Sequence, residues 1–295
     1  MLTIAVTSRT LFDLEAEHQI YQQHGSDAFN HYQRENENTI LNPGSAFGLV
    51  SKLLKLNTPG KPRDRVEIVL LSRNSAEAGL RVLNSIHAHN LDIDTAVFTS
   101  GGNRFKYYPA AAVHLFLSAN EDEVKMALES GVAAATLMPN TFRATECTGQ
   151  VKIAFDGDAV LFSDESERVY RAKGLAAFVA HELENVDVTL PDGPIKPFLI
   201  ELHNLQKMLK DVVPPPISIA LVTARGSLQG KRVFHTFRKW GMDLDTIILT
   251  GGKSKAGFLL AYGADIFFDD TKHHIEQASA HVPSAHVPSG IANES

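Results

Sequence analysis

The stretch Val151-Lys-Ile-Ala-Phe-Asp-Gly-Asp-Ala-Val-Leu-Phe-Ser-Asp-Glu165 joins a short apolar run to a pair of acids. The run from Ile153 to Phe155 predicts a buried strand, and Asp156 and Asp158 follow its carboxyl end. In an open parallel sheet, ligands bind at the carboxyl ends of the strands. Two neighbouring acids repel each other unless a cation neutralises them, and their hard oxygen ligands suit Mg²⁺. A lone Asp-x-Asp is common, so this interpretation needs support from the rest of the chain.

The pattern of the whole chain predicts an α/β fold. Apolar strands alternate with amphipathic helices at the spacing of βαβ units, which indicates a parallel sheet. Strands are expected at 3–7, 66–71, 95–99, 113–117, 132–137, 151–155, 217–223, 246–250 and 264–268, and helices at 14–37, 46–56, 76–89, 121–129, 167–182, 195–210, 228–240 and 255–262. The tail repeats Ala-His-Val-Pro-Ser at 280–284 and 285–289, and its prolines favour an extended edge or a loop over a helix.

Composition indicates a soluble globular protein, since 44% of the 295 residues are hydrophobic and 21% are charged. The formal net charge is −6 and no basic block occurs, which argues against nucleic-acid binding. The single cysteine, Cys147, excludes an internal disulfide and a cysteine metal cluster. The sequence shows no signal-peptide pattern and no run of 18 apolar residues, so we expect a cytoplasmic protein without a membrane span.

The chain matches itself when it is shifted by 151 residues. The ungapped match aligns 68–118 with 219–269, and a shift of 149 aligns 4–6 with 153–155. Identical pairs include Gly79/Gly230, Arg81/Arg232, Val82/Val233, Asp92/Asp243, Asp94/Asp245, Thr95/Thr246, Thr99/Thr250, Gly101/Gly252 and Phe116/Phe267. We interpret the match as a duplicated α/β unit, with packing patterns shared by two similar folds as the alternative.

The two copies differ where a metal could bind. The aligned pairs are Asp156 and Thr7, Asp158 and Arg9, Thr223 and Ser72, Lys255 and Arg104, Asp269 and Ser118, and Asp270 and Ala119. Without these carboxylates the first copy offers neither metal ligands nor a nucleophile. We therefore expect residues 1–150 to form a degenerate α/β half and residues 151–295 to form the catalytic half, with a helical cap inserted at about 163–215.

Four expected strand ends in the second half carry chemically useful groups. They are Asp156-Gly-Asp158, Thr223 within Ile219–Arg225, the turn Gly251-Gly-Lys-Ser-Lys255, and Asp269-Asp270. Parallel strands place all four at one edge of the sheet. Acids for Mg²⁺, a hydroxyl, a lysine and backbone amides in one small volume suit phosphoryl transfer. Each signal alone also fits a strand-end hydroxyl, a solvated lysine or a helix cap, so the prediction rests on all four together.

These motifs resemble the haloacid dehalogenase-like phosphatase superfamily and, more narrowly, the cytosolic 5'-nucleotidase type I family. The similar segments are 155–167, 221–225, 267–270 and 285–288 in the second half, and 4–9, 11–13 and 116–119 in the first. The resemblance covers nearly the whole chain. It implies a Rossmann-like parallel sheet with a small helical cap, and a Mg²⁺-dependent 5'-nucleotidase that hydrolyses an AMP-like nucleoside monophosphate. The implied partner is a small-molecule nucleotide, and self-association through the duplicated half stays open.

The resemblance also implies residue roles. Asp156 would attack phosphorus and form an aspartyl-phosphate, and Asp158 would protonate the leaving 5'-oxygen and then activate water. Phosphate contacts would come from Gly157, Thr223, Ala224 and Lys255, with Lys253 as the alternative lysine. Metal ligands would be Asp156, the Asp158 carbonyl, and Asp269 or Asp270. Nucleoside contacts would come from Phe162, Ser163, Asp164, Glu165 and Phe178, with core packing and helix initiation as the alternative.

Several alternatives stay open. The same site could act on another phosphomonoester, transfer phosphate to an acceptor alcohol, or bind a nucleotide as a sensor without turnover. The tail histidines lack the ligand pattern of a zinc site. In the degenerate copy, Arg73 and Arg104 could bind an anionic effector or make surface salt bridges.

Overall fold

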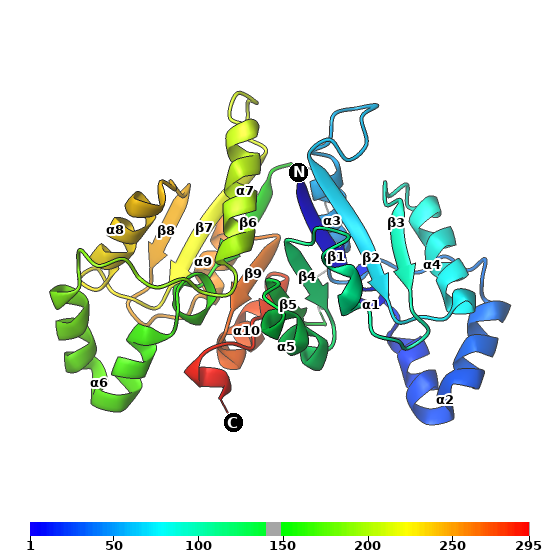
Figure 1. Ribbon diagram of the computed structural model, residues 1–295, viewed down its shortest axis with the longest axis horizontal. Helices are drawn as coiled ribbons and strands as arrows, with labels where there is room; N and C mark the ends of the chain where they lie inside the picture. Colours follow the sequence, from blue (N-terminus) through cyan, green and yellow to red (C-terminus); the bar gives the residue numbers. More distant parts are fainter. Residues whose placement is uncertain (140–148, 295) are drawn as a thin grey trace.

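Ten strands form one sheet in the computed structural model, which describes residues 1–139 and 149–294 (Figure 1). Cys147 lies outside the described residues. The strands are β1 (Leu2–Val6), β2 (Val66–Ser72), β3 (Thr95–Phe98), β4 (Leu115–Ser118), β5 (Ala134–Leu137), β6 (Val151–Phe155), β7 (Ile217–Thr223), β8 (Thr246–Leu249), β9 (Ile266–Asp269) and β10 (Ser284–His286). They lie in the order β3-β2-β1-β4-β5-β10-β9-β6-β7-β8.

The helices alternate with the strands along the chain. The α-helices are α1 (Ser8–Leu11), α2 (Glu15–Glu35), α3 (Phe47–Leu54), α4 (Ala76–Ala88), α5 (Glu121–Glu129), α6 (Glu165–Glu184), α7 (Lys196–Met208), α8 (Gly230–Trp240), α9 (Ala256–Tyr262) and α10 (Lys272–Ser279). Three short turns are η1 (Phe105–Tyr107), η2 (Gly157–Leu161) and η3 (Ile291–Asn293). The mostly parallel α/β fold that the sequence predicts is confirmed.

Local sequence signals explain several helix boundaries. The Ser75 hydroxyl accepts a hydrogen bond from the Ala78 amide at the start of α4, and the Asn120 side chain caps α5 in the same way. Helices α8 and α9 end at Gly241 and Gly263, whose φ values of 66° and 73° are in the left-handed region. Where a helix ends determines where the next strand begins, and so also where the carboxyl end of that strand lies.

The strand order repeats about the centre of the sheet. Reading outward from the middle, the first half runs β5-β4-β1-β2-β3 and the second half runs β10-β9-β6-β7-β8. Neighbouring strands pair in parallel, except that β5 and β10 meet antiparallel where the halves join. The tail residues of β10 are extended as expected, but the expectation of an edge is wrong, because β10 lies inside the sheet. Pro283 and Pro288 flank the strand, so neither removes a donor from its ladder.

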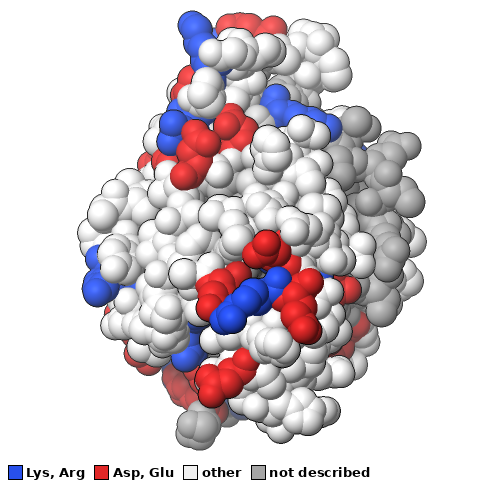
Figure 2. Space-filling model, turned by 90° about the vertical axis from the view of Figure 1, so that its right-hand side faces the viewer, with Lys and Arg blue, Asp and Glu red and all other residues white. Residues whose placement is uncertain are grey.

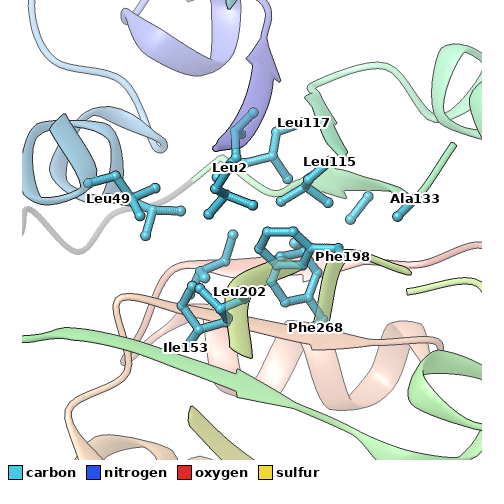
Figure 3. Packing of buried hydrophobic residues seen from close by; sticks show 14 of the residues in the cluster. Leu2, Leu49, Leu115, Leu117, Ala133, Ile153, Phe198, Leu202 and Phe268 are labelled. Carbon is cyan, nitrogen blue, oxygen red and sulfur yellow. The ribbon is translucent and has the colours of Figure 1, made fainter. Parts of the chain in front are cut away.

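Alternate residues of each strand point to opposite faces and build different parts of the core. One face carries a continuous cluster that crosses both halves, and the other face carries two smaller clusters, one in each half. Figure 3 shows the crossing, where Phe198 and Leu202 of α7 lie between Leu115 of the first half and Phe268 of the second. Helix α7 therefore belongs to the common core of both halves.

Two long helices project from the same side of the sheet, at opposite ends of the molecule (Figure 1). Helix α2 bends at Gly25 and helix α6 bends at Gly174, where φ is 80° and 79°. A residue with a side chain would be strained at such a φ, which explains a glycine at each bend. The region expected to form a cap holds two helices, α6 and α7. Helix α6 projects from the sheet and α7 packs in the core, so only α6 is in a position to act as a cap.

Within the described ranges, every helix is too short or too polar to cross a membrane. Figure 2 shows the face over α2 and α4, where lysines and arginines are scattered or lie beside acidic residues. The described residues of this face therefore do not form a single basic patch.

Candidate active site

Three acids and a lysine from separate strand ends meet at the carboxyl edge of the second half. Asp156 follows β6, Asp269 ends β9 with Asp270 next to it, and Lys255 precedes α9. The Lys255 Nζ lies 2.8 Å from Asp156 Oδ1 and 2.6 Å from Asp269 Oδ2. The side chains of Asp156, Asp269 and Asp270 each offer an oxygen within 4.8 Å of the others. All four residues are buried.

Burial and crowding shift the pKa values of these groups in different directions. Burial raises the pKa of Asp156 to about 7, although Lys255 acts against the shift. Burial, together with the charges of Asp156 and Asp269, raises the pKa of Asp270 to about 9. Burial acts upward on Asp269 too, but Lys255 and His274 outweigh it and hold its pKa below the usual value. Lys255 and His274 therefore favour an ionised Asp269, while Asp270 keeps its proton near neutral pH and Asp156 changes its charge there.

The described residues fit a hard divalent cation. Asp156 Oδ1 and Asp270 Oδ2 are buried without a hydrogen-bond partner among these residues, although Lys255 forms an ion pair with the first. Asp270 Oδ2 thus has no donor, and one ammonium faces three buried carboxyl groups, which is unfavourable unless a further cation neutralises them. Because all the candidate ligands are oxygens, the set suits Mg²⁺ better than a metal that prefers nitrogen or sulfur.

The phosphate candidates lie beside this acid cluster. Thr223 ends β7 and is buried, and a Cβ built on Gly157 would lie 3.6 Å from its Oγ1. The amide of Gly252 donates to the carbonyl of Ala224 at 3.0 Å, which ties the turn before α9 to the end of β7. Lys255 is buried at the acids, while Lys253 is exposed. The structure thus brings the four predicted strand ends together.

Asp158 is held by an arginine that the sequence analysis did not single out. Arg225 donates from Nε and Nη2 to both carboxylate oxygens of Asp158, at 2.9 and 2.7 Å. Its Nη1 pairs with Glu182 of α6, and its guanidinium lies 5.5 Å from the centre of the Phe178 ring. In the sequence, only its position two residues after Thr223, at the end of the segment Ile219–Arg225, could have indicated a role for Arg225. Its partner Glu182 comes from a helix with no visible link to that motif.

A buried network continues from Glu182 into the bent helix. The Ser166 hydroxyl donates to Glu182 at 2.7 Å, and Arg232 of α8 donates to the same carboxylate at 3.1 Å. Arg232 also pairs with Glu165, which in turn contacts His181 at 3.0 Å. Helix α6 is therefore fastened to the sheet by buried charges, in direct connection with the Asp158 side chain.

The C-terminal tail crosses the site beside Asp270. His286 of β10 contacts the Asp270 carbonyl oxygen at 2.9 Å, and Asn293 donates to the same oxygen at 2.9 Å. Burial lowers the pKa of His286. A Cβ built on Gly290 would lie only 2.6 Å from that of Ala159, so the tail passes close to the loop that carries Asp158. These contacts give His286 and Asn293 structural functions.

The residues proposed for nucleoside contacts already have protein partners. Phe162 is fully buried, and its ring lies 5.6 Å from Phe237 and 5.5 Å from Trp240. The Ser163 amide donates to the Pro191 carbonyl. Asp164 accepts from the Ile291 amide and pairs with Arg168, while Glu165 contacts Arg232. Phe178 is partly buried under Arg225.

A cavity of about 430 Å³ lies between the halves, next to the segment that follows Asp270. Its lining residues are Glu121, Lys125, Arg171, Thr271, Lys272, His273, Ala292, Asn293 and Glu294. Thr271 directly follows Asp270, and Asn293 contacts the Asp270 carbonyl. The volume suits a small ligand, but this lining is polar where the base of a nucleotide would favour aromatic surface.

Comparison with known proteins agrees with this geometry. A family model described as 5'-nucleotidase matches residues 1–294. The chain is 37% identical over 286 residues to human cytosolic 5'-nucleotidase 1B, covering 94% of this chain and 47% of the relative. It thus spans about half the length of that curated relative. No solved structure matches the chain.

Proposed function

The chain belongs to the 5'-nucleotidase family, and on that premise we propose that it hydrolyses a nucleoside 5'-monophosphate to a nucleoside and phosphate. The observation that carries the proposal is the buried cluster of Asp156, Asp269, Asp270 and Lys255 at the joined strand ends. Such a cluster offers a nucleophile, metal ligands and a cation for phosphoryl oxygens in one place. The name of the human relative also suggests a cytosolic location and a nucleotide substrate for this protein.

In the first step, a carboxylate oxygen of Asp156 attacks phosphorus, and the bond between phosphorus and the 5'-oxygen breaks. For this step Asp158 would take up a proton from solvent, leaving its two-point contact with Arg225, and give that proton to the leaving oxygen, so the nucleoside departs neutral. Lys255 and the Thr223 hydroxyl hold the phosphoryl oxygens, together with the backbone at Gly157 and Ala224. Their burial supports this role, because fixed donors in a site without water stabilise developing negative charge more strongly.

In the second step, water attacks the phosphorus of the aspartyl-phosphate. Asp158 accepts a proton from that water, the bond between phosphorus and Asp156 breaks, and phosphate leaves. Arg225 supports this step because its two hydrogen bonds hold the Asp158 carboxylate in one orientation.

The acids would hold a Mg²⁺ ion through Asp156, the backbone carbonyl of Asp158, and Asp269 or Asp270. When bound, the ion would neutralise charge on the phosphoryl group. The support is the group of three buried acids around a single ammonium, with one Asp270 oxygen that has no donor, which suits a hard cation. Of Asp269 and Asp270, Asp269 is the better candidate ligand, because Lys255 and His274 hold its pKa low and so favour its ionised form.

The division of labour between the halves is part of the proposal. Residues 151–295 would carry the reaction, and α6, within the region 163–215, would cover the site and exclude water. Residues 1–150 would serve as a degenerate half, because Thr7, Arg9 and Ser118 stand where the second half has acids. The two halves share one continuous hydrophobic cluster, so neither is expected to fold independently.

Phosphate release from a panel of phosphomonoesters tests the function. We expect Mg²⁺-dependent release from AMP-like nucleotides and little release from sugar phosphates, with Asp156→Asn as the inactive control. A preference for another monoester would replace the substrate but keep the chemistry, and a phosphorylated product in the presence of an alcohol would indicate transfer. Tight nucleotide binding without any release would favour a sensor.

A further inference from the structure

The carboxyl edge of the first half carries a second polar cluster that the proposed reaction does not use. Its members occupy the strand ends that correspond to the acid cluster of the second half. The corresponding pairs are Thr7 and Asp156, Ser72 and Thr223, Arg104 and Lys255, and Ser118 and Asp269. The strand order around both edges is the same, so the two clusters have the same setting in the sheet.

Arg104 is the central residue of this cluster. Its side chain is 3% exposed, and it lies 5.2 Å from the centre of the Phe116 ring and pairs with Glu123. Nη2 is the atom that pairs with Glu123, while Nε is buried without a hydrogen-bond partner among the described residues. A buried guanidinium that keeps an unpaired N–H is unfavourable, and an anion is the natural acceptor for that donor.

The charges at this edge favour an anion without help from a metal. Arg73, at the end of β2, is half-exposed and lies 3.6 Å from the same Glu123, so a single carboxylate faces two guanidinium groups. Ser72, at the end of β2 and directly before Arg73, has its hydroxyl 3.1 Å from that of Ser8, and such uncharged groups can also donate to an anion. The second half shows the opposite balance, where acids outnumber cations and an anion needs a divalent ion first.

We propose that Ser72, Arg73 and Arg104 form a binding site for a phosphate-type dianion, either free phosphate or the phosphoryl group of a nucleotide, that requires no metal ion. This site, the first-half anion site, is separate from the hydrolytic cluster and does not depend on turnover. Bound anion would take the place of Glu123 as the partner of Arg104 and Arg73, which would release the Glu123 carboxylate from the strand ends.

Calorimetric titration of the full chain in EDTA tests the site, with inorganic phosphate in one arm and AMP in the other. We expect phosphate to bind the wild-type protein, and Arg73→Gln and Arg104→Gln each to weaken that binding by about tenfold or more, because each removes charged donors. Glu123→Gln should tighten it, because the competing carboxylate is lost. Arg63→Gln, which removes a first-half arginine that lies in an exposed ion pair with Asp94, is the matched control and should bind phosphate as the wild type does.

The arms also separate the sources of the anion. Equal binding of phosphate and AMP would indicate free phosphate, and tighter binding of AMP would indicate a nucleotide; both support the site. Absence of binding in EDTA would overturn it, as would wild-type binding of phosphate in both the Arg73→Gln and the Arg104→Gln proteins. Arg73 is half-exposed, so Arg73→Gln and Glu123→Gln keep the test valid if Arg104→Gln does not fold. A failure of the proposed hydrolysis would appear separately, as absent phosphate release.

Discussion

Replacing Lys255 with methionine should destabilise the metal-free protein strongly and more so at higher pH. The Lys255 ammonium is buried between Asp156 and Asp269, at 2.8 and 2.6 Å. Methionine fills a similar volume but leaves two buried carboxyl groups without their cation. Removing one partner of a buried ion pair typically costs about 3 to 5 kcal/mol.

The protonation of Asp156 determines how large the loss of stability in Lys255→Met should be within this range. With a pKa of about 7 in the intact cluster, Asp156 can take up a proton at about pH 6, which limits the loss to about 3 kcal/mol. At about pH 8, Asp156 must either ionise without its cation or hold a proton against the pH. Both cost free energy, so the loss of stability should approach about 5 kcal/mol. For a chain of 295 residues, these losses correspond to a decrease in Tm of about 5 to 8 °C.

Thermal unfolding in EDTA, at both pH values, measures the effect. Saturating Mg²⁺ should restore part of the Tm, because the metal replaces the missing positive charge. The double variant Lys255→Met/Asp156→Asn should also recover part of the loss, since it removes one of the unpaired acids. A Lys255→Met protein that unfolds within about 1 °C of the wild type at both pH values would refute the idea that this lysine balances buried charge.

Three further predictions concern the acids and their partners. Asp156→Asn should lower kcat by about 10⁴-fold or more with an unchanged circular dichroism spectrum, because it removes the nucleophile; near-normal turnover would reject that assignment. Arg225→Gln should lower kcat about 10- to 100-fold with a smaller change in KM, because Asp158 loses its two-point contact, whereas a change in KM alone would indicate a role in substrate binding. Mg²⁺ binding should release protons at neutral pH and tighten as pH rises from about 6 to 9, because Asp156 and Asp270, with pKa values of about 7 and 9, lose their protons in this range. Since folding raises both pKa values, the metal-free protein should also lose stability as the pH rises over that range. Calorimetry of Mg²⁺ binding in two buffers measures the proton release, and unfolding in EDTA measures the stability. Mg²⁺ binding that does not depend on pH would contradict this prediction.

The sequence predicted the chemically important strand ends because parallel strands convert a linear pattern into a spatial one. Each apolar run ends at a polar residue, and the sheet brings those ends together whatever their separation in the chain. Asp156, Thr223, Lys255 and Asp269 were all located in this way. That Lys255 and not Lys253 reaches the acids required the structure, because it depends on how the turn before α9 folds back toward β9.

Other features could not be predicted, because their partners lie far apart in the chain. The contact of Arg225 with Glu182 depends on how α6 bends at Gly174 and returns to the sheet. Helix α7 has the composition of an ordinary amphipathic helix, and its position between the halves depends on the antiparallel junction of β5 and β10. That junction itself uses a three-residue strand from the tail, too short to show a periodic pattern.

The central claim is that Asp156 receives the phosphoryl group in a pocket built from distant strand ends. Acid quenching of the Mg²⁺-loaded protein during turnover of AMP labelled with ³²P at its phosphate, followed by peptide mapping, tests it most directly. We expect acid-stable label on the peptide that contains Asp156, and this label should be cleaved by hydroxylamine and absent from Asp156→Asn. Label on a histidine, or equal labelling of Asp156→Asn, would contradict it.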